Sequence, residues 1–384
     1  MRVAYVGDFI NHGKSLPTIG TSIVILLSMV NEVESIDVYC PEQNETIEDF
    51  KLPHNVKLIP CYKYDNSQSI LRLLSLKENH YDRIIFNLLP TGFGTKGASN
   101  LVGLMIPLSL RILFKQKNVR VLYHNSVFTN DIKKLGYISF FNKIRAFFLG
   151  FIERELFKNL ETFVLLDLYK QRITKKIGAN KVKVMGGRYL EAIASIYINN
   201  KIREELHHTT HDPHIILIHG NWGPQKNLEL GLDSLRKLRQ SGKNFRLVIS
   251  GGINHHFRDY EKQFNDIIQH YSDIIYTYKG YVREKDIMEL FLMADLVLLP
   301  YNAPGGHSGV LEQAIAFHVQ TVSIDFPEYR EQKMGNSNIV LSSIERFGDT
   351  IFKVYESLPR EYKENIEIKD LIALAKRNAQ ALIS

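Results

Sequence analysis

Short apolar runs, most of them rich in Val, Ile and Leu, alternate along the chain with longer segments of helical length. Runs of this kind are typical of strands buried on both faces of a parallel sheet, and the longer segments can supply the crossover helices. In the first half of the chain the runs are residues 3–6, 36–40, 83–88, 119–123, 162–166 and 182–185. The helical segments include residues 21–31, 101–115 and 140–158. The alternation predicts a doubly wound α/β sheet.

The alternation is interrupted once and then starts again. A polar segment follows residue 198, and further strand-like runs occur at 215–219, 245–250, 274–279, 296–299 and 321–324. Because 384 residues exceed what one hydrophobic core usually serves, two domains are expected. We predict two Rossmann-like domains at residues 1–198 and 213–345, joined by a linker at 199–212. C-terminal helices are expected at 346–384, and a return to the N-terminal domain is one packing left open for them.

The charge is distributed unevenly along the chain. The net charge is +7, but residues 101–188 alone hold 17 Lys and Arg against 5 Asp and Glu. Such a density attracts the phosphates of lipids, nucleotides or nucleic acids, and a solvated basic surface is the alternative. Two cysteines, Cys40 and Cys61, are too few for a disulfide framework or a Cys-rich zinc site. The first residues lack the pattern of a signal peptide, so a cytoplasmic protein is expected.

Two glycine-containing segments look like phosphate loops but depart from the patterns. Residues 7–15 end in Gly-Lys-Ser, yet five residues separate the two glycines where a Walker loop has four, and Pro17 stands where the helix should begin. Residues 92–97 match G-x-G-x-x-G, but the strand 119–123 is followed by His124 and not by an acid that could bind a ribose. These departures argue against an ATPase and against a dinucleotide enzyme.

Two other loops have the chemistry needed to bind a diphosphate. Lys226 lies between the strand 215–219 and the next helix, where a cation and helix amides favour an anion. After the strand 296–299 comes the sequence Pro-Gly-Gly-His-Ser-Gly, whose small residues let a phosphate approach the backbone. Ser308 can donate its hydroxyl, and Glu312 can accept hydrogen bonds from ribose hydroxyls. The alternatives are a solvated lysine and an acid that complements the helix dipole.

These loops and the strand between them carry a family resemblance. Gly220 and Lys226 have the spacing of a G-R-L-x-x-x-K loop, with Asn221 in place of the arginine. Residues 294–300 read A-D-x-x-x-x-P, and Glu312 matches the second glutamate of an E-x7-E motif. Together they resemble the retaining GT-B glycosyltransferases of group 1, or family 4, most closely over residues 213–330.

The resemblance implies a GT-B fold, in which two Rossmann-like domains face each other across a cleft. The N-terminal domain would bind the acceptor, and the C-terminal domain would bind a nucleotide-diphosphate sugar. The implied reaction is transfer of a hexosyl group to a hydroxyl acceptor with retention of configuration. His124 matches the family's active-site histidine, and the implied catalytic residues are His124 and Lys226. The implied donor-binding residues are Gly13, Asn221, Lys226, Gly306, His307, Ser308, Gly309 and Glu312.

No cofactor and no metal site are expected. The sequence contains no D-x-D motif, so the metal-dependent single-domain type of sugar transferase is disfavoured. The cluster of His207, His208, His211 and His214 has no fixed scaffold or carboxylate pattern and is interpreted as part of the linker. Charge neutralisation is then assigned to Lys226, backbone amides and helix dipoles.

Two features leave the activity and the partners open. Pro304 stands in place of the first glutamate of E-x7-E, a carboxylate that the family directs at the donor sugar. A catalytically degenerate GT-B fold that acts as a binding or partner subunit is therefore the alternative function. The segment 140–158 mixes phenylalanines with Lys and Arg, which favours peripheral contact with an anionic membrane at its cytoplasmic face and a lipid-linked or glycan acceptor. A buried helix is the alternative there, and no nucleic-acid partner is expected.

Overall fold

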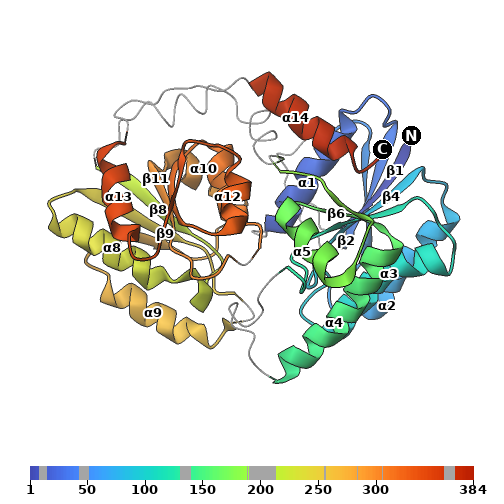
Figure 1. Cartoon of the computed structure of the whole chain (residues 1–384), viewed down its shortest axis with the longest axis horizontal. Coiled ribbons are helices and arrows are strands. Elements are labelled where there is room, and N and C mark those ends of the chain that lie inside the picture. The colour runs from blue at the N-terminus through green and yellow to red at the C-terminus, as the bar shows by residue number, and fades with distance from the viewer. Residues whose placement is uncertain are drawn as a thin grey trace. The chain divides into compact units, whose positions relative to one another are not determined.

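The computed structural model describes residues 1–7, 15–42, 52–129, 140–187, 189, 213–254, 257–282, 284–304, 306–358 and 368–384. The chain forms two compact α/β units (Figure 1). The first comprises Met1–Lys133, Tyr137–Ile193 and Lys369–Ser384, and the second comprises Lys134–Gly136 and Ala194–Ile368. Each unit has one parallel sheet with helices packed against it. The predicted fold class of two Rossmann-like units is confirmed.

The N-terminal unit contains a seven-stranded sheet in the order β3-β2-β1-β4-β5-β6-β7. Its strands are β1 (Arg2–Val6), β2 (Ser35–Pro41), β3 (Val56–Tyr62), β4 (Arg83–Leu88), β5 (Val119–Tyr123), β6 (Glu161–Val164) and β7 (Val182–Val184). Its helices are α1 (Ser15–Ser28), α2 (Ser67–Ile70), η1 (Leu71–Glu78), α3 (Gly97–Ile112), α4 (Phe140–Asn159), α5 (Asp167–Ile177) and α14 (Ile368–Gln380). The strand order reverses between β1 and β4, and in open α/β sheets ligands bind at the carboxyl ends of the strands at such a switch point.

The C-terminal unit contains a six-stranded sheet in the order β10-β9-β8-β11-β12-β13. Its strands are β8 (His214–His219), β9 (Phe245–Ser250), β10 (Ile275–Lys279), β11 (Leu296–Leu299), β12 (Gln320–Ile324) and β13 (Ile339–Ser342). Its helices are η2 (Pro224–Lys226), α8 (Leu228–Gln240), α9 (Tyr260–His270), α10 (Glu284–Met293), α11 (Gly309–Ala316), α12 (Pro327–Lys333) and α13 (Phe347–Glu356). Here the order reverses between β8 and β11, so the carboxyl ends of these two strands are the expected ligand site of this unit.

Two edge strands are absent from the predicted set. β3 contains Pro60 and has exposed or half-exposed residues at most positions, and β13 has only four residues, of which two are half-buried. An edge strand lacks the continuous apolar run of a strand buried on both faces, and proline is tolerated there. The hydrophobic pattern therefore misses the edge strands β3 and β13, whereas the edge strands β7 and β10 coincide with the predicted runs 182–185 and 274–279.

Among the residues that the structure describes, no helix combines the length and the apolar character needed to cross a bilayer.

The end of the chain is fastened to the N-terminal unit. The Arg83 Nε donates to the Ile383 carbonyl at 2.9 Å, and the Arg120 Nη1 donates to the Leu382 carbonyl at 2.7 Å. The Arg120 Nε also pairs with Glu161 Oε2 at 2.6 Å, and burial lowers the pKa of Arg120. Both arginines stand near the amino ends of their strands, β4 and β5. The tail thus lies away from the carboxyl ends of these strands.

We expect Arg120→Ala to loosen the tail by about 2 kcal/mol, because a charged donor to a buried carbonyl and the partner of Glu161 are removed together. Hydrogen exchange of the amides at residues 375–384 measures this local stability. Arg154→Ala, at an exposed position of α4, is the matched control and should leave exchange unchanged. Unaltered tail exchange in Arg120→Ala would contradict the fastening described here.

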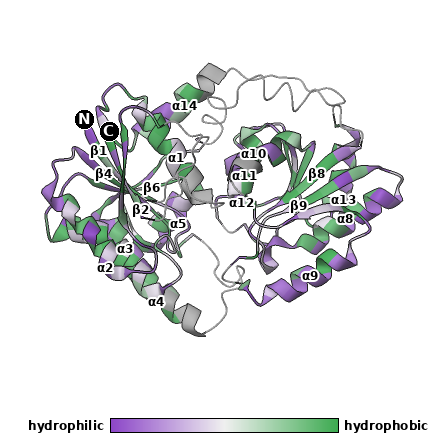
Figure 2. Cartoon of the chain, turned by 180° about the vertical axis from the view of Figure 1, so that it is seen from behind, coloured by the Kyte–Doolittle hydropathy of each residue, from purple (hydrophilic) through white to green (hydrophobic). Residues whose placement is uncertain are grey.

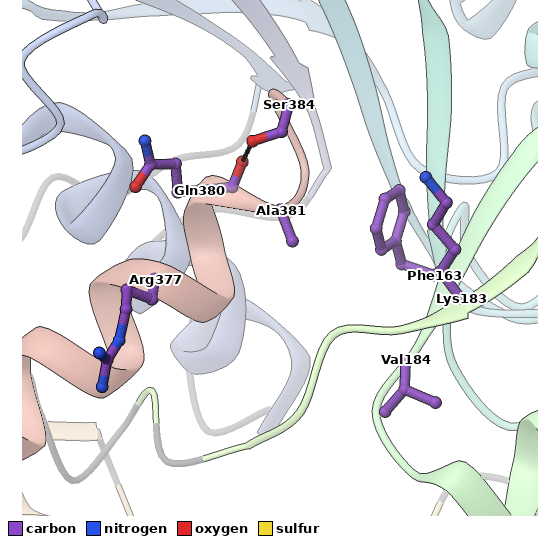
Figure 3. Close-up of a pocket in the computed structure, with 7 residues that line it drawn as sticks. All are labelled: Phe163, Lys183, Val184, Arg377, Gln380, Ala381 and Ser384. Carbon is purple, nitrogen blue, oxygen red and sulfur yellow. Dashed lines mark hydrogen bonds between the residues drawn. The ribbon is translucent and has the colours of Figure 1, made fainter.

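A cavity of about 340 Å³ lies between α14 and the edge of this sheet (Figure 3). One wall is formed by α14 and the residues after it, and the other by β6 and β7 (Figure 3). Its lining residues are Phe163, Lys183, Val184, Arg377, Gln380, Ala381 and Ser384. None of the predicted site residues lines it, and Lys183 is already paired with Glu161.

Candidate functional site

Two loops meet at the carboxyl ends of β8 and β11. These neighbouring strands are parallel, with Leu296 opposite Ile216, so the loops that follow them emerge at one edge of the sheet. The Asn302 amide donates to the Gln225 carbonyl at 3.1 Å, and the Asn302 side chain donates to the Pro224 carbonyl at 3.3 Å. The structure therefore brings the Lys226 loop into direct contact with the loop that leads into Gly306–Gly309.

The shape of the first loop depends on a close backbone approach. Gly251, directly after β9, has φ +111°, and a Cβ there would lie 1.7 Å from the Gly220 carbonyl oxygen. Only glycine fits such a position. Trp222 is fully buried beneath the loop, and its Nε1 donates to the Gly251 carbonyl at 3.1 Å. The loop is thus held by the buried Trp222 and by Gly251, which directly follows β9.

Lys226 is held at this edge by an aromatic ring. Its Nζ lies 3.7 Å from the ring centroid of Tyr301, which is 1% exposed, and Lys226 itself is partly buried. Burial lowers the pKa of Lys226 to about 7. Burial and the nearby Lys226 lower the pKa of His219 to about 4, so His219 is neutral at pH 7. Burial makes Lys226 costly to keep charged, and among the described residues no salt bridge pairs it with a carboxylate, so it is suited to an anionic ligand.

The second loop ends in the amino terminus of α11. Ser308 is the N-cap, and its Oγ accepts a hydrogen bond from the Leu311 amide at 3.2 Å. The Ser308 amide donates to Gln332 Oε1 at 3.0 Å, and Gln332 Nε2 returns a bond of 2.7 Å to the Ser308 carbonyl. Within the described chain no residue bonds the amides of Gly309 and Val310, which open the helix. Those two amides, more than that of Ser308, are placed to bind an anion.

Glu312 and His307 form a buried polar pair behind this helix terminus. Their side chains are 5% and 7% exposed, and His307 Nε2 lies 3.4 Å from Glu312 Oε2. Gln332 Nε2 lies at the same distance from this oxygen. The His307 Nδ1 is buried without a partner among the described residues. A ligand that reached this pair would meet the carboxylate of Glu312, which can accept hydrogen bonds, and the Nδ1 of His307, which has no partner among the described residues.

A chain of aromatic contacts connects Lys226 with the turn before α11. The Tyr301 ring that lies under Lys226 meets the Tyr329 ring edge-on, at 6.5 Å between centroids. The Tyr329 hydroxyl donates to the Pro304 carbonyl at 3.0 Å. Sequence reasoning missed Tyr301, Tyr329 and Gln332, because all three act through tertiary contacts and belong to no motif.

The other predicted donor-binding and metal residues are placed as follows. Asn221 is exposed at the surface of the first loop, and Gly306 is buried with φ +102°. Gly13, His207, His208 and His211 lie outside the described residues. His214 lies in β8, with Nδ1 3.5 Å from Asp295 Oδ2. Among the described residues, no group of three His, Cys, Asp or Glu side chains could hold a metal ion.

In the N-terminal unit His124 stands at the carboxyl end of β5. It is 7% exposed, and its amide continues the ladder by donating to the Leu88 carbonyl at 2.9 Å. Its Nε2 lies 2.7 Å from Asn87 Oδ1, so a hydrogen bond joins the two side chains. Asn87 also lies against Gly7, where a Cβ would come within 3.0 Å of the Asn87 Cβ. Asn87 was missed, although a polar residue inside the apolar run 83–88 was a usable signal.

The loop after His124 rests on a buried carboxylate. Glu153 on α4 has no exposed surface and accepts hydrogen bonds from the Tyr123 hydroxyl at 2.7 Å, the Ser126 hydroxyl at 2.5 Å and the Val127 amide at 3.0 Å. Burial raises the pKa of Glu153 to about 7 despite these donors. Asn125, between them, has φ +55°. Glu153 therefore holds the strand end and the strained turn that position His124.

Comparisons with known proteins bear on the fold and on the C-terminal half. Residues 198–365 match the family model of glycosyl transferases group 1. No curated protein matches this sequence. A sucrose-phosphate synthase (tll1590) from Thermosynechococcus elongatus superimposes with a TM-score of 0.63 at 12% identity, covering 100% of this chain and 95% of that one.

Two further solved structures have the same architecture. WaaG, a glycosyltransferase involved in lipopolysaccharide biosynthesis, superimposes with a TM-score of 0.61 at 15% identity, covering 99% of this chain and 94% of that one. Anabaena Alr3699/HepE in complex with UDP-glucose gives a TM-score of 0.58 at 15% identity and coverages of 100% and 94%. At these identities the likeness establishes the fold. The chain thus has the GT-B fold of these structures, and its residues 198–365 match the family model of the group 1 glycosyl transferases.

Proposed function

We propose that this protein transfers a hexosyl group from a nucleoside diphosphate sugar to a hydroxyl acceptor, with retention of anomeric configuration. The observation that carries the proposal is the contact between the Lys226 loop and the loop that leads into α11, at the carboxyl ends of β8 and β11. The family match of residues 198–365 supports it. The Anabaena protein, whose structure is a complex with UDP-glucose, supports a nucleotide-sugar donor.

Lys226 and the amino terminus of α11 have the charges that the departing group requires. The bond between the sugar C1 and the β-phosphate oxygen breaks with its electron pair on that oxygen, so negative charge grows on the β-phosphate. An ammonium and free helix amides placed there stabilise the transition state more than the ground state. Burial holds the pKa of Lys226 near 7. A bound diphosphate raises this pKa, so the lysine becomes fully protonated in the complex.

The acceptor side of the proposal rests on the N-terminal unit. The acceptor hydroxyl oxygen bonds to C1 from the face that the phosphate leaves, and its proton passes to the departing phosphate oxygen. His124, hydrogen-bonded to Asn87, is proposed to orient the acceptor or the sugar. A glycan or a lipid-linked glycan is the proposed acceptor class.

Glu312 is proposed to bind the ribose hydroxyls of the donor. We expect Glu312→Ala to weaken binding of a nucleoside diphosphate about tenfold, because one charged acceptor is lost. Calorimetric titration with UDP measures the change. Glu289→Ala removes an exposed carboxylate of α10 in the same unit and is the control. Equal affinities in the Glu312 variant and the control would refute the ribose role.

Pro304 favours a second candidate function. Its position corresponds to the first glutamate of E-x7-E, so the loop offers no carboxylate there. The Pro304 carbonyl accepts a hydrogen bond from the Tyr329 hydroxyl. A protein that binds the donor without turning it over, as a partner subunit, is the resulting alternative.

One assay separates the two functions. The protein is incubated with a panel of nucleotide sugars, and both nucleotide binding and sugar transfer to glycan and lipid-phosphate acceptors are measured. Transfer from at least one donor is the expected result. Binding without turnover on any acceptor would favour the partner subunit, and a protein that binds no donor would exclude both readings.

A further inference from the structure

Helix α4 exposes an apolar stripe to solvent. Ile144, Phe147, Phe148 and Phe151 are 39%, 75%, 57% and 65% exposed. Their spacing of three to four residues places them on one side of the helix. The rings of Phe147 and Phe148 contact each other, 5.8 Å apart between centroids. Three phenylalanines, each more than half exposed on two turns of a helix, form a patch that a monomeric surface rarely leaves uncovered.

The stripe is not the face by which α4 packs on its own unit. The packed face carries Glu153, Leu156 and Phe157, all with no exposed surface, and Phe157 meets Tyr123 edge-on at 5.3 Å. The part of α4 that carries Glu153, Leu156 and Phe157 would stay in place without Phe147, Phe148 and Phe151. The earlier alternative of a buried helix holds for Phe157 and fails for these three residues.

The neighbouring helix adds to this surface. Helix α3 packs against α4 and exposes Leu101, Met105 and Ile112 at helical spacing, followed by Leu113 at 70% exposure. Of the 17 large hydrophobic residues exposed in the described chain, nine lie on these two helices or directly after α3. The hydrophobic stretches of both helices can be followed in Figure 2. The apolar exposure of the molecule is thus concentrated on one pair of helices.

Basic side chains accompany the apolar ones. Arg154 and Lys158 continue the exposed side of α4, one and two turns beyond Phe151, and Lys115 and Lys117 are exposed directly after α3. The sequence around them, residues 101–188, holds 17 basic against 5 acidic residues. Two copies of this surface would bring like charges together, whereas an anionic surface complements them.

We propose that the α3–α4 surface, defined by Leu101, Met105, Ile112, Leu113, Ile144, Phe147, Phe148, Phe151, Arg154 and Lys158, docks the protein on an anionic phospholipid bilayer. The phenylalanines enter the boundary between headgroups and acyl chains, and the arginine and lysines bind lipid phosphates. The proposal does not depend on sugar transfer, because no residue of this surface takes part in the donor or acceptor roles assigned above.

Vesicle sedimentation of the full chain tests the proposal. The probes are vesicles of phosphatidylcholine alone and of three parts phosphatidylcholine to one part phosphatidylglycerol. Wild-type protein should sediment with the anionic vesicles at least tenfold more than with the neutral ones. Replacing Phe147, Phe148 and Phe151 together by serine should reduce this binding at least tenfold. Arg154→Gln with Lys158→Gln should reduce it less and weaken its dependence on salt.

A matched control removes three exposed apolar side chains of the other unit, Tyr276, Tyr281 and Ile344, and should bind vesicles like the wild type. A local probe is also available, since the one native tryptophan, Trp222, is fully buried. In Phe148→Trp, vesicles should shift the emission to the blue. Unchanged UDP binding of the serine variant would show that the fold and the donor site are intact.

Three results would overturn the proposal. They are absence of wild-type binding to anionic vesicles, equal binding by the serine variant and the wild type, and a dimer in solution that the serine variant dissociates. The third result would identify a second copy as the occupant.

Discussion

Lys226→Ala should lower kcat/KM for the donor sugar by a factor of about 10² to 10³, the loss typical when one pre-oriented donor to a developing anion is removed. The fold should survive, because Tyr301 stays buried without the lysine above it, and because the loop is anchored by Trp222 and Gly251. Steady-state kinetics with the active donor of the panel measures the loss. Lys237→Ala, exposed on α8 in the same unit, should retain wild-type kinetics.

The pKa of Lys226 adds a dependence on pH that a merely structural lysine would lack. Since the free lysine has a pKa of about 7 and binds the diphosphate as the ammonium, affinity should fall progressively as the pH rises above 7. The Lys226→Ala variant should show no such decline. If the variant binds and turns over donor like the wild type, Lys226 has no role at the phosphate.

Glu153→Ala should lower the free energy of unfolding of the N-terminal unit by about 3 to 5 kcal/mol. The substitution leaves the Tyr123 hydroxyl, the Ser126 hydroxyl and the Val127 amide without their buried acceptor, and unmade buried hydrogen bonds cost about 1 to 3 kcal/mol each. Hydrogen exchange of β5 peptides reports on this unit alone, whereas the fluorescence of Trp222 reports on the other. Glu155→Ala, on the same helix, should cost far less.

The same residue should give the unit a distinctive pH response. Burial raises the Glu153 pKa from 4.5 to about 7 in the folded state, so the folded chain holds more protons than the unfolded chain between these values. The stability that the protonated Glu153 contributes is fully present below pH 4.5 and is lost as the pH rises through 7. The free energy of unfolding falls by about 3 kcal/mol in total over this range. Glu153→Gln removes this titration. If wild type and Glu153→Gln lose stability equally between pH 5 and pH 8, the carboxyl is not protonated in the fold.

The inner strands of both sheets could be predicted because each is buried on both faces and leaves a continuous apolar run. The edge strands β3 and β13 could not be predicted, since Pro60 and the half-exposed positions of these two strands break that pattern. Helix α4 was ambiguous for a related reason. Phenylalanines stand on its exposed side, at Phe147, Phe148 and Phe151, and on its packed side, at Phe157, and periodicity does not identify a face when both faces carry such residues.

The loops of the candidate site were found because they follow strand ends and carry small or cationic residues. The residues that surround these loops were not predicted, because they come from segments remote in sequence. Tyr301 lies 75 positions from Lys226, Gln332 lies 24 positions from Ser308, and Asn87 lies 37 positions from His124. Glu153 was hidden for the same reason, as a single acid on an apolar helix whose three donors lie 26 to 30 positions earlier.

The most direct test of the account is a crystal structure of the protein with UDP bound, because the central claim concerns where a diphosphate is held. We predict that the β-phosphate lies within hydrogen-bonding distance of Lys226 Nζ and of the Gly309 and Val310 amides, with the ribose at Glu312. A nucleotide whose phosphates point away from Lys226, or one bound elsewhere on the C-terminal unit, would contradict the claim.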